Sequence, residues 1–200
     1  MTLAYFVTHP DVQIDPAVPI TAWPLSERGR TRMRGMLDLP WVSSLAQIFC
    51  SEEQKAIDGA EIIAASTGLP VSVIPSLGEN DRSATGFLPP EEFWGVVEEF
   101  FAHPETRVRG WESAAHARAR VVAGVDEGLA ATGPDESVVF VAHGGVGGLL
   151  LSHLKQMPIS RDHDQPPAEP GSPPGSGGGY YFAFDRSSRV LHHEWQPIDP

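Results

Sequence analysis

The chain has little cysteine and little positive charge. Its single cysteine, Cys50, excludes an internal disulfide and argues against a metal site built on thiolates. Because Cys50 ends an apolar run, we expect it to be buried and inert, as free cysteines usually are. Lysine and arginine total 14 against 26 aspartate and glutamate residues, a formal net charge of -12. Nucleic acid favours a basic surface, so we expect no nucleic-acid partner.

Long apolar runs are also missing. No stretch approaches the roughly 18–20 apolar residues that a membrane-spanning helix needs, and the first residues do not resemble a signal peptide. We therefore expect no membrane partner and a cytoplasmic location. The composition is otherwise ordinary, with 41% hydrophobic and 20% charged residues. Together with the length it predicts one domain over residues 1–200, and it leaves the oligomeric state open.

Apolar strand patterns alternate with helical patterns along the chain. This alternation predicts an α/β protein, a three-layer α/β/α sandwich with a mostly parallel central sheet. Residues 164–179, rich in proline, glycine and serine, are expected to form a flexible surface loop. The expected strands are residues 3–7, 46–50, 71–74, 138–142, 180–184 and 190–195. The expected helices run from 25 to before Pro40 and over 51–67, 90–101, 113–131 and 146–154.

Two histidines directly follow buried strands. His9 ends the run Phe-Val-Thr-His, and His143 ends the run Phe-Val-Ala-His. Ligands of parallel sheets bind beyond the carboxyl ends of the strands, so the two rings can meet in one crevice. A second pair, His192 and His193, is taken as structural, since adjacent strand residues face opposite sides and cannot easily share a metal ion.

Five motifs, in order along most of the chain, resemble those of the histidine phosphatase, or phosphoglycerate-mutase-like, superfamily. Their strength lies in the order, because none is decisive alone. Residues 7–11, Val-Thr-His-Pro-Asp, stand where the family has a strand followed by Arg-His-Gly-Glu, and residues 24–29 resemble Pro-Leu-Thr-Glu-x-Gly. Residues 50–61 resemble Ser-Ser-Pro-Leu-x-Arg-Ala-x-x-Thr-Ala-Glu. Residues 77–79, Leu-Gly-Glu, resemble the segment of the catalytic acid, and 142–145, Ala-His-Gly-Gly, the second-histidine motif.

The resemblance implies a phosphoglycerate-mutase-like fold and a phosphatase that hydrolyses a small phosphorylated substrate without metal or cofactor. Carried over by motif, His9 is the nucleophile that forms a phosphohistidine, His143 the second histidine of the phosphate pocket, and Glu79 the acid/base. The chemistry suits these residue types. A neutral imidazole attacks phosphorus, positive donors surround the oxygens, and a carboxyl group moves the proton.

Four positions depart from the family pattern. Thr8 and Lys55 stand where phosphate-binding arginines are expected, Pro10 replaces a glycine, and Asp15 stands where many members carry asparagine. Lys55 keeps the charge but loses the bidentate fork, and Thr8 keeps only a hydrogen-bond donor. We still expect Thr8, Lys55 and Asp15 to bind phosphate. The phosphate site then has at least one guanidinium fewer than the family pattern.

Arg82 is the candidate replacement for a missing arginine. It lies three residues after Glu79 in a polar segment and could reach the same crevice; the alternative is a solvent-exposed loop arginine. Gly144 and the glycine that follows permit close backbone approach to a phosphate at a helix N-terminus, or simply a tight turn. Glu112, at the start of a helix, is expected to cap or support rather than to catalyse.

The residues leave two functions open. The retained His9, Glu79 and His143 favour an enzyme, whereas the missing arginines favour a weak or inactive relative that binds a phosphorylated or acidic ligand or a protein partner. Within the enzyme class, the short segment between Leu77 and Pro104 favours hydrolysis over a mutase reaction.

Overall fold

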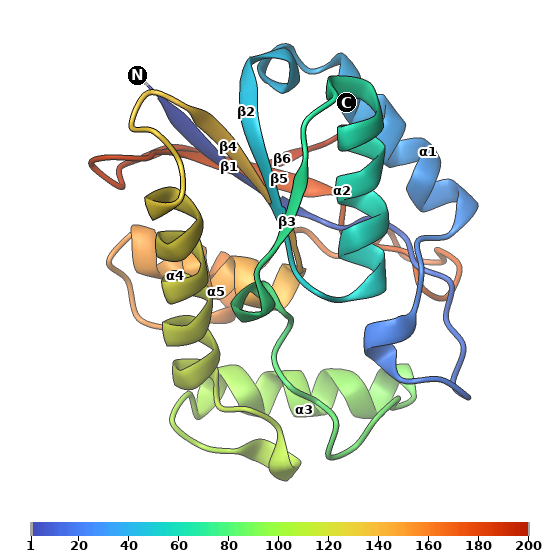
Figure 1. Ribbon diagram of the computed structural model, residues 1–200. Coiled ribbons are helices and arrows are strands. Elements are labelled where there is room, and N and C mark those ends of the chain that lie inside the picture. The colour runs from blue at the N-terminus through green and yellow to red at the C-terminus, as the bar shows by residue number, and fades with distance from the viewer. Residues whose placement is uncertain (1, 200) are drawn as a thin grey trace.

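The computed structural model describes residues 2–199 and places all its strands in one mixed sheet of order β3-β2-β4-β1-β5-β6 (Figure 1). Neighbouring strands are parallel from β3 to β1, whereas β5 runs antiparallel to β1 and β6 antiparallel to β5. The expected α/β fold with a mostly parallel central sheet is confirmed. The strands are β1 (Leu3–Thr8), β2 (Leu45–Cys50), β3 (Val71–Val73), β4 (Ser137–Ala142), β5 (Tyr180–Asp185) and β6 (Leu191–Pro197).

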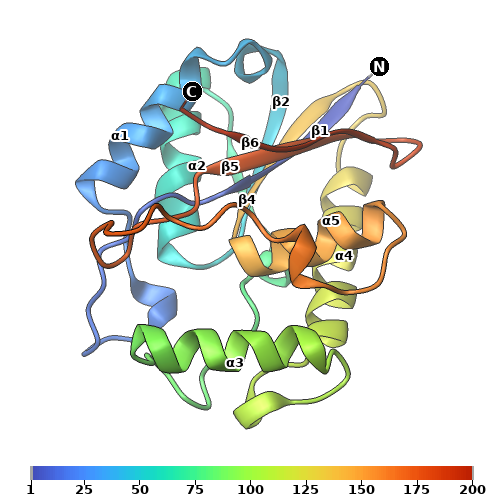
Figure 2. The same ribbon diagram turned by 180° about the vertical axis from the view of Figure 1, so that it is seen from behind.

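Helices cover both faces of the sheet, as Figures 1 and 2 show. The side chains of β4 explain why, since they alternate between two cores. Phe140 packs among residues of α3, α4 and α5, whereas Val139 and Val141 pack against α1 and α2. Helix α3 lies across the end of the molecule where β1 and β4 finish. The helices are α1 (Glu27–Gly35), α2 (Gln54–Thr67), α3 (Pro90–Ala102), α4 (Ala114–Ala130) and α5 (Gly144–Leu154).

Local sequence signals explain most helix ends. The Ser26 hydroxyl accepts a hydrogen bond from the N–H of Gly29 and caps α1, and Ser113 caps α4 in the same way. Gly68, at φ 75°, ends α2 in the left-handed conformation that glycine adopts freely. None of the described helices is long and apolar enough to cross a membrane.

Three helix boundaries differ from expectation. Helix α1 ends at Gly35 and the chain continues as a short 3-10 helix, Met36–Asp38. Helix α2 begins at Gln54 rather than at 51, because Glu53 has extended backbone angles and Ser51 is bonded to His143 at the end of β4. Helix α5 begins at Gly144, two residues early, because a carboxylate from outside the helix binds its first amides.

The loop 164–179 folds back over the end of β1. Gly178, at φ 65°, lies so close to this segment that a Cβ there would stand 2.0 Å from the carbonyl oxygen of His9. Glycine is therefore required at this contact. The loop remains at the surface, but it forms one wall of the space beside His9.

Candidate active site

His9 and His143 lie side by side at the carboxyl edge of the sheet. Their ring centroids are 5.1 Å apart, in an edge-to-face arrangement. The backbone N–H of His9 donates to the carbonyl of Ala142 at 3.0 Å, which ties the end of β1 to the end of β4. The two rings therefore converge because their strands are neighbours.

The hydrogen bond of the His9 ring fixes its tautomer. Nδ1 lies 2.9 Å from the carbonyl oxygen of Pro10, and a carbonyl can only accept. Nδ1 therefore carries the proton, and Nε2 of the neutral ring keeps its lone pair. Burial, helped by the charge of Lys55, lowers the pKa of His9 to about 4, so the ring is neutral at pH 7.

A cavity of about 710 Å³ opens beside His9. The segment 78–83 separates it from a second cavity of about 630 Å³, and residues Glu79, Asn80 and Arg82 border both. Aromatic side chains of α3 and the Pro/Gly-rich loop form the remaining walls. The first cavity's lining includes His9, Glu79, Arg82, Phe93, Trp94, Trp111, Gly144, Arg161, Asp164 and Gln165.

The carboxylate of Glu79 sits on the N-terminus of α5. Its Oε2 accepts from the N–H of Gly145 and its Oε1 from that of Val146, both at 3.0 Å. The positive end of a helix dipole favours an anion there. A Cβ on Gly145 would stand 2.7 Å from Oε1, so glycine is needed for this approach. These amides bind Glu79, which explains the early start of α5.

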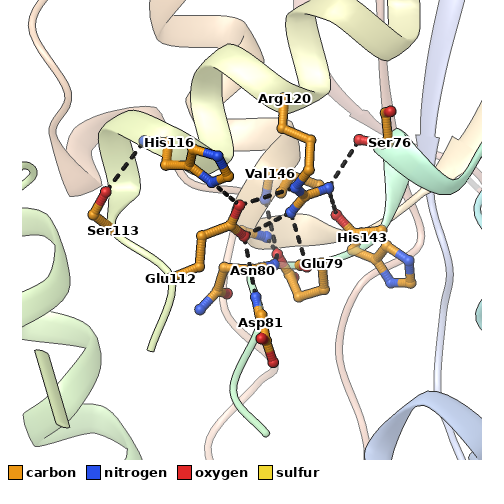
Figure 3. Close-up of polar contacts among 12 residues, drawn as sticks. Ser76, Glu79, Asn80, Asp81, Glu112, Ser113, His116, Arg120, His143 and Val146 are labelled. Carbon is orange, nitrogen blue, oxygen red and sulfur yellow. Dashed lines mark hydrogen bonds and ion pairs between the residues drawn. The ribbon is translucent and has the colours of Figure 1, made fainter. Parts of the chain in front are cut away.

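Arg120 on α4 braces the segment that carries Glu79 (Figure 3). Its guanidinium donates to both oxygens of Glu112 and to the carbonyls of Ser76, Gly78 and Glu79, all within 3.0 Å. Glu112 also accepts from the N–H of Asp81 at 3.1 Å. The pair thus fixes the backbone on both sides of Glu79, and Glu112 has the supporting position that its place at the start of α4 predicted.

A second carboxylate, Glu53, is buried behind the histidines. Its Oε2 forms an ion pair with Nζ of Lys55, and its Oε1 accepts from the N–H of Glu79 at 2.8 Å. The same Oε1 lies 3.4 Å from Nε2 of His143, which is 2.7 Å from the hydroxyl of Ser51. Burial opposes ionisation of Glu53, but its interactions with His143 and Lys55 and its hydrogen bonds from Lys55 and the N–H of Glu79 outweigh burial and lower its pKa to about 2. Burial lowers the pKa of His143 well below its usual value, so that ring is neutral.

Comparison with known proteins establishes the family. The model of the histidine phosphatase superfamily (branch 1) matches residues 18–169, a range that contains Glu79 and His143 and begins after His9. The chain belongs to the histidine phosphatase superfamily. No curated protein matches its sequence.

Several solved structures share the fold. Mycobacterial glucosyl-3-phosphoglycerate phosphatase, in complex with inorganic phosphate, is 21% identical over 100% of both chains, with a TM-score of 0.77. YhfR from Bacillus stearothermophilus is 20% identical over 96% of this chain and 95% of its own, with a TM-score of 0.71. A putative alpha-ribazole-5'-P phosphatase from Escherichia coli is 20% identical over 98% and 96%, with a TM-score of 0.70.

Two of the predicted phosphate ligands, Thr8 and Asp15, do not face the cavity. The Thr8 hydroxyl is buried, donates to Oε1 of Gln165 at 2.6 Å and accepts from the N–H of Tyr180 at 3.1 Å, so it anchors the Pro/Gly-rich loop. Asp15 is exposed and accepts from the N–H of Ala17 at 2.9 Å, because it caps a turn in its own loop. Neither borders the cavity beside His9.

Lys55 and Gly144 also differ from expectation. Lys55 is buried, and its ammonium group is bonded to Glu53 and to the carbonyl of Ile20 at 2.9 Å instead of facing open space. Gly144 does border the cavity, but a Cβ there would stand 2.4 Å from Nε2 of Gln165. The glycine therefore makes room for Gln165.

Arg82 borders the cavity, as the hypothesis of a replacement arginine requires. Its guanidinium lies 5.3 Å from the ring centre of Phe93 and 5.7 Å from that of Trp111. Within residues 2–199 it pairs with no carboxylate, so its charge faces the cavity uncompensated.

The sequence analysis missed Glu53, Ser51 and Arg120. Glu53 had a visible signal, because a charged residue stands where the family motif has leucine, two positions before Lys55. Arg120 had a weaker one, the spacing of Glu112, His116 and Arg120 along one helix face. Cys50 is buried, as expected, and burial raises the pKa of its thiol to about 12.

Proposed function

We propose that this chain is a phosphomonoester hydrolase in which His9 takes up the phosphoryl group. One observation supports this most strongly: the Nδ1 hydrogen bond to Pro10 leaves Nε2 of a neutral ring as a nucleophile at the cavity wall. Membership in the histidine phosphatase superfamily, and the phosphatases among its structural neighbours, support the same reaction class.

In the first proposed step, the lone pair of His9 Nε2 forms a bond to phosphorus. The bond from phosphorus to the ester oxygen breaks, and that oxygen takes its proton from the carboxyl group of Glu79. In the second step, water attacks phosphorus and gives its proton to Glu79, while the N–P bond breaks and its electrons return to Nε2. The products are the alcohol and inorganic phosphate.

Charge stabilisation in this proposal comes chiefly from Arg82. It is the cavity-lining cation without a carboxylate partner in the described chain, whereas Arg161 pairs with Glu98. The volume of about 710 Å³ admits a small phosphate monoester. The short segment between Leu77 and Pro104 favours hydrolysis over phosphoryl transfer between two positions of one substrate.

The ion pair of Lys55 with Glu53 supports a second candidate, a chain that binds a phosphorylated or acidic ligand without turning it over. Thr8 and Lys55 stand where the family has arginines, and both are engaged within the chain. The phosphate pocket is therefore weakly charged. Measurable affinity for inorganic phosphate without release of phosphate from any ester would favour this candidate.

The test is release of phosphate from a panel of small phosphate esters. The wild-type protein should release phosphate, His9→Ala should release none, and Glu79→Gln should lower kcat. His192→Ala is the matched control, because His192 is an exposed strand histidine far along the chain from the site. Full activity in His9→Ala would overturn the proposed mechanism.

A further inference from the structure

Glu53 places a buried negative charge beside His143, the neighbour of His9; it borders the second cavity and not the cavity beside His9. We infer that Glu53 is a built-in anion that neutralises Lys55 and restricts the site to phosphoryl groups bearing a single negative charge. This inference rests on the proposed function, since it names the ionic form of ester that the same site takes. It makes Glu53 a specificity-determining residue.

The burial of the pair shows that it is part of the folded core. The side chains of Glu53 and Lys55 are 6% and 4% exposed. A lysine ammonium group has three donors, and here one goes to Glu53 and one to the carbonyl of Ile20. Lys55 therefore has one donor left. Its charge is neutralised by Glu53, so the pair carries no net charge, unlike the arginine at this position in the family motif.

Glu53 also engages the other two parts of the site. Its Oε1 lies 3.4 Å from Nε2 of His143 and accepts from the N–H of Glu79 at 2.8 Å. His143 and Ser51, bonded to each other at this point, are fully buried, and Glu53 is the anion that lies beside them. The carboxylate of Glu53 thus takes up donors that would otherwise be free to bind phosphate.

The charges of Glu53 and of the groups around it sum to a value near zero. Lys55 on α2 balances Glu53, and Arg120 on α4 balances Glu112. His9 and His143, at the ends of β1 and β4, are neutral. On the segment 78–83, Arg82 supplies a positive charge, and Glu79 supplies a negative one once it has given up its proton. Besides Glu53, the groups in this balance are His9, Lys55, Glu79, Arg82, Glu112, Arg120 and His143.

This balance disfavours a dianion. Glu53 Oε1 lies 3.4 Å from Nε2 of His143, whose ring lies beside that of His9, so this buried carboxylate repels a dianionic phosphoryl group on His9 more strongly than a monoanionic one. The monoanion meets half of that repulsion and still pairs with Arg82. A phosphate monoester gains its second charge with a pKa of about 6. The site should therefore work best below that pH, where His9 remains a neutral nucleophile down to about 4.

The test compares Glu53→Gln with the wild type. Glutamine keeps an acceptor for the N–H of Glu79 and removes the charge. The matched control is Glu52→Gln, an exposed neighbour that removes the same charge one residue away. Two quantities are measured: the affinity for inorganic phosphate by calorimetry at pH 5 and pH 8, and the pH profile of kcat/KM for an alkyl phosphate.

In the wild type and in Glu52→Gln, we expect phosphate affinity and kcat/KM to fall above about pH 6. In Glu53→Gln, phosphate should bind at least about tenfold tighter at pH 8, and the profile should extend to higher pH. Should Glu53→Gln fail to fold, as judged by circular dichroism, Glu53→Leu restores the residue of the family motif and should act in the same direction. Unchanged phosphate affinity and an unchanged pH profile in the folded variant would overturn the inference.

Failure of the inference and failure of the proposed function give different results. If no variant releases phosphate but Glu53→Gln binds it more tightly at pH 8, the role of Glu53 stands and the hydrolase proposal fails. If His9-dependent hydrolysis is present but Glu53→Gln keeps the wild-type profile and affinity, the hydrolase proposal stands and the role of Glu53 is wrong.

Discussion

The guanidinium of Arg120 donates two hydrogen bonds to the carboxylate of Glu112, from Nε to Oε1 at 2.9 Å and from a terminal nitrogen to Oε2 at 2.8 Å. Its other N–H groups bind three carbonyls around Glu79 (Figure 3). A bidentate pair of this kind holds the segment before Asp81 rigidly against α4. The position of Glu79 thus depends on a residue that never enters the cavity.

Arg120→Met should therefore cost both stability and rate. We expect the free energy of unfolding in urea to fall by about 3 kcal/mol, because the variant leaves Glu112 and three carbonyls without their donor. The value of kcat should fall while the KM changes less. Arg118→Met on the same helix is the control, since its side chain makes no hydrogen bond within residues 2–199. Wild-type kcat in a folded Arg120→Met protein would show that Glu79 needs no such brace.

A substitution at Gly145 tests the binding of the Glu79 carboxylate to the N-terminus of α5. Gly145→Ala should displace the carboxylate, since the new Cβ would stand 2.7 Å from its Oε1. We expect kcat to fall at least about tenfold, because a misplaced acid/base loses most of its contribution. Gly95→Ala is the matched control: it also adds a methyl group to a helical glycine, but no atom lies within 4 Å of the added carbon. That control should gain up to about 1 kcal/mol of stability and keep full activity.

Arg82 should act on substrate binding. Arg82→Ala removes the unpaired guanidinium beside Phe93 and Trp111, and we expect KM for an alkyl phosphate to rise about tenfold, the loss of one charge-assisted hydrogen bond. Arg82→Lys should recover part of this loss. Arg107→Ala removes an exposed arginine outside the cavity lining and should match the wild type. Wild-type values of KM and kcat in Arg82→Ala would show that Arg82 has no role in substrate binding.

The neutral state of His9 makes stability depend on pH. An unfolded histidine has a pKa of about 6.5, and burial lowers that of folded His9 to about 4. Between these values the unfolded chain binds more protons than the folded one. The contribution of His9 to the free energy of unfolding is therefore complete above pH 6.5. About 2–3 kcal/mol of it is lost as the pH falls toward 4.

Urea unfolding between pH 4 and pH 7 measures this dependence. His9→Gln should flatten the slope over that interval, with His143 still contributing, because burial lowers the pKa of His143 as well. His192→Gln replaces an exposed histidine and should keep the wild-type slope. An identical slope in His9→Gln would mean that His9 is not buried in its neutral form.

The sequence was sufficient for the layout of the site. Strand ends and short motifs place His9, His143 and Glu79 at one edge of a parallel sheet, because the backbone of such a sheet leaves few alternatives. The central strands β1, β4 and β5 are mostly apolar, and the bounds of all the expected strands agree with the structure to within one or two residues.

The partners of the site residues could not be predicted in the same way. The Thr8 hydroxyl bonds to Gln165, 157 positions away, and Glu53 bonds to the amide of Glu79, 26 positions away. A motif fixes where a backbone lies, but the bonds of a side chain depend on which distant groups pack beside it. Thr8 and Asp15 were assigned by position, and their short side chains are satisfied locally or by the loop before they reach the cavity.

The central claim is that His9 carries the phosphoryl group. It is tested most directly by mixing the protein with a rapidly cleaved aryl phosphate, quenching in alkali to preserve phosphohistidine, and locating the added mass by peptide mass spectrometry. The account predicts one phosphoryl group on the peptide that contains His9, and none in His9→Ala. A phosphoryl group on another residue, or turnover by His9→Ala at the wild-type rate, would contradict it.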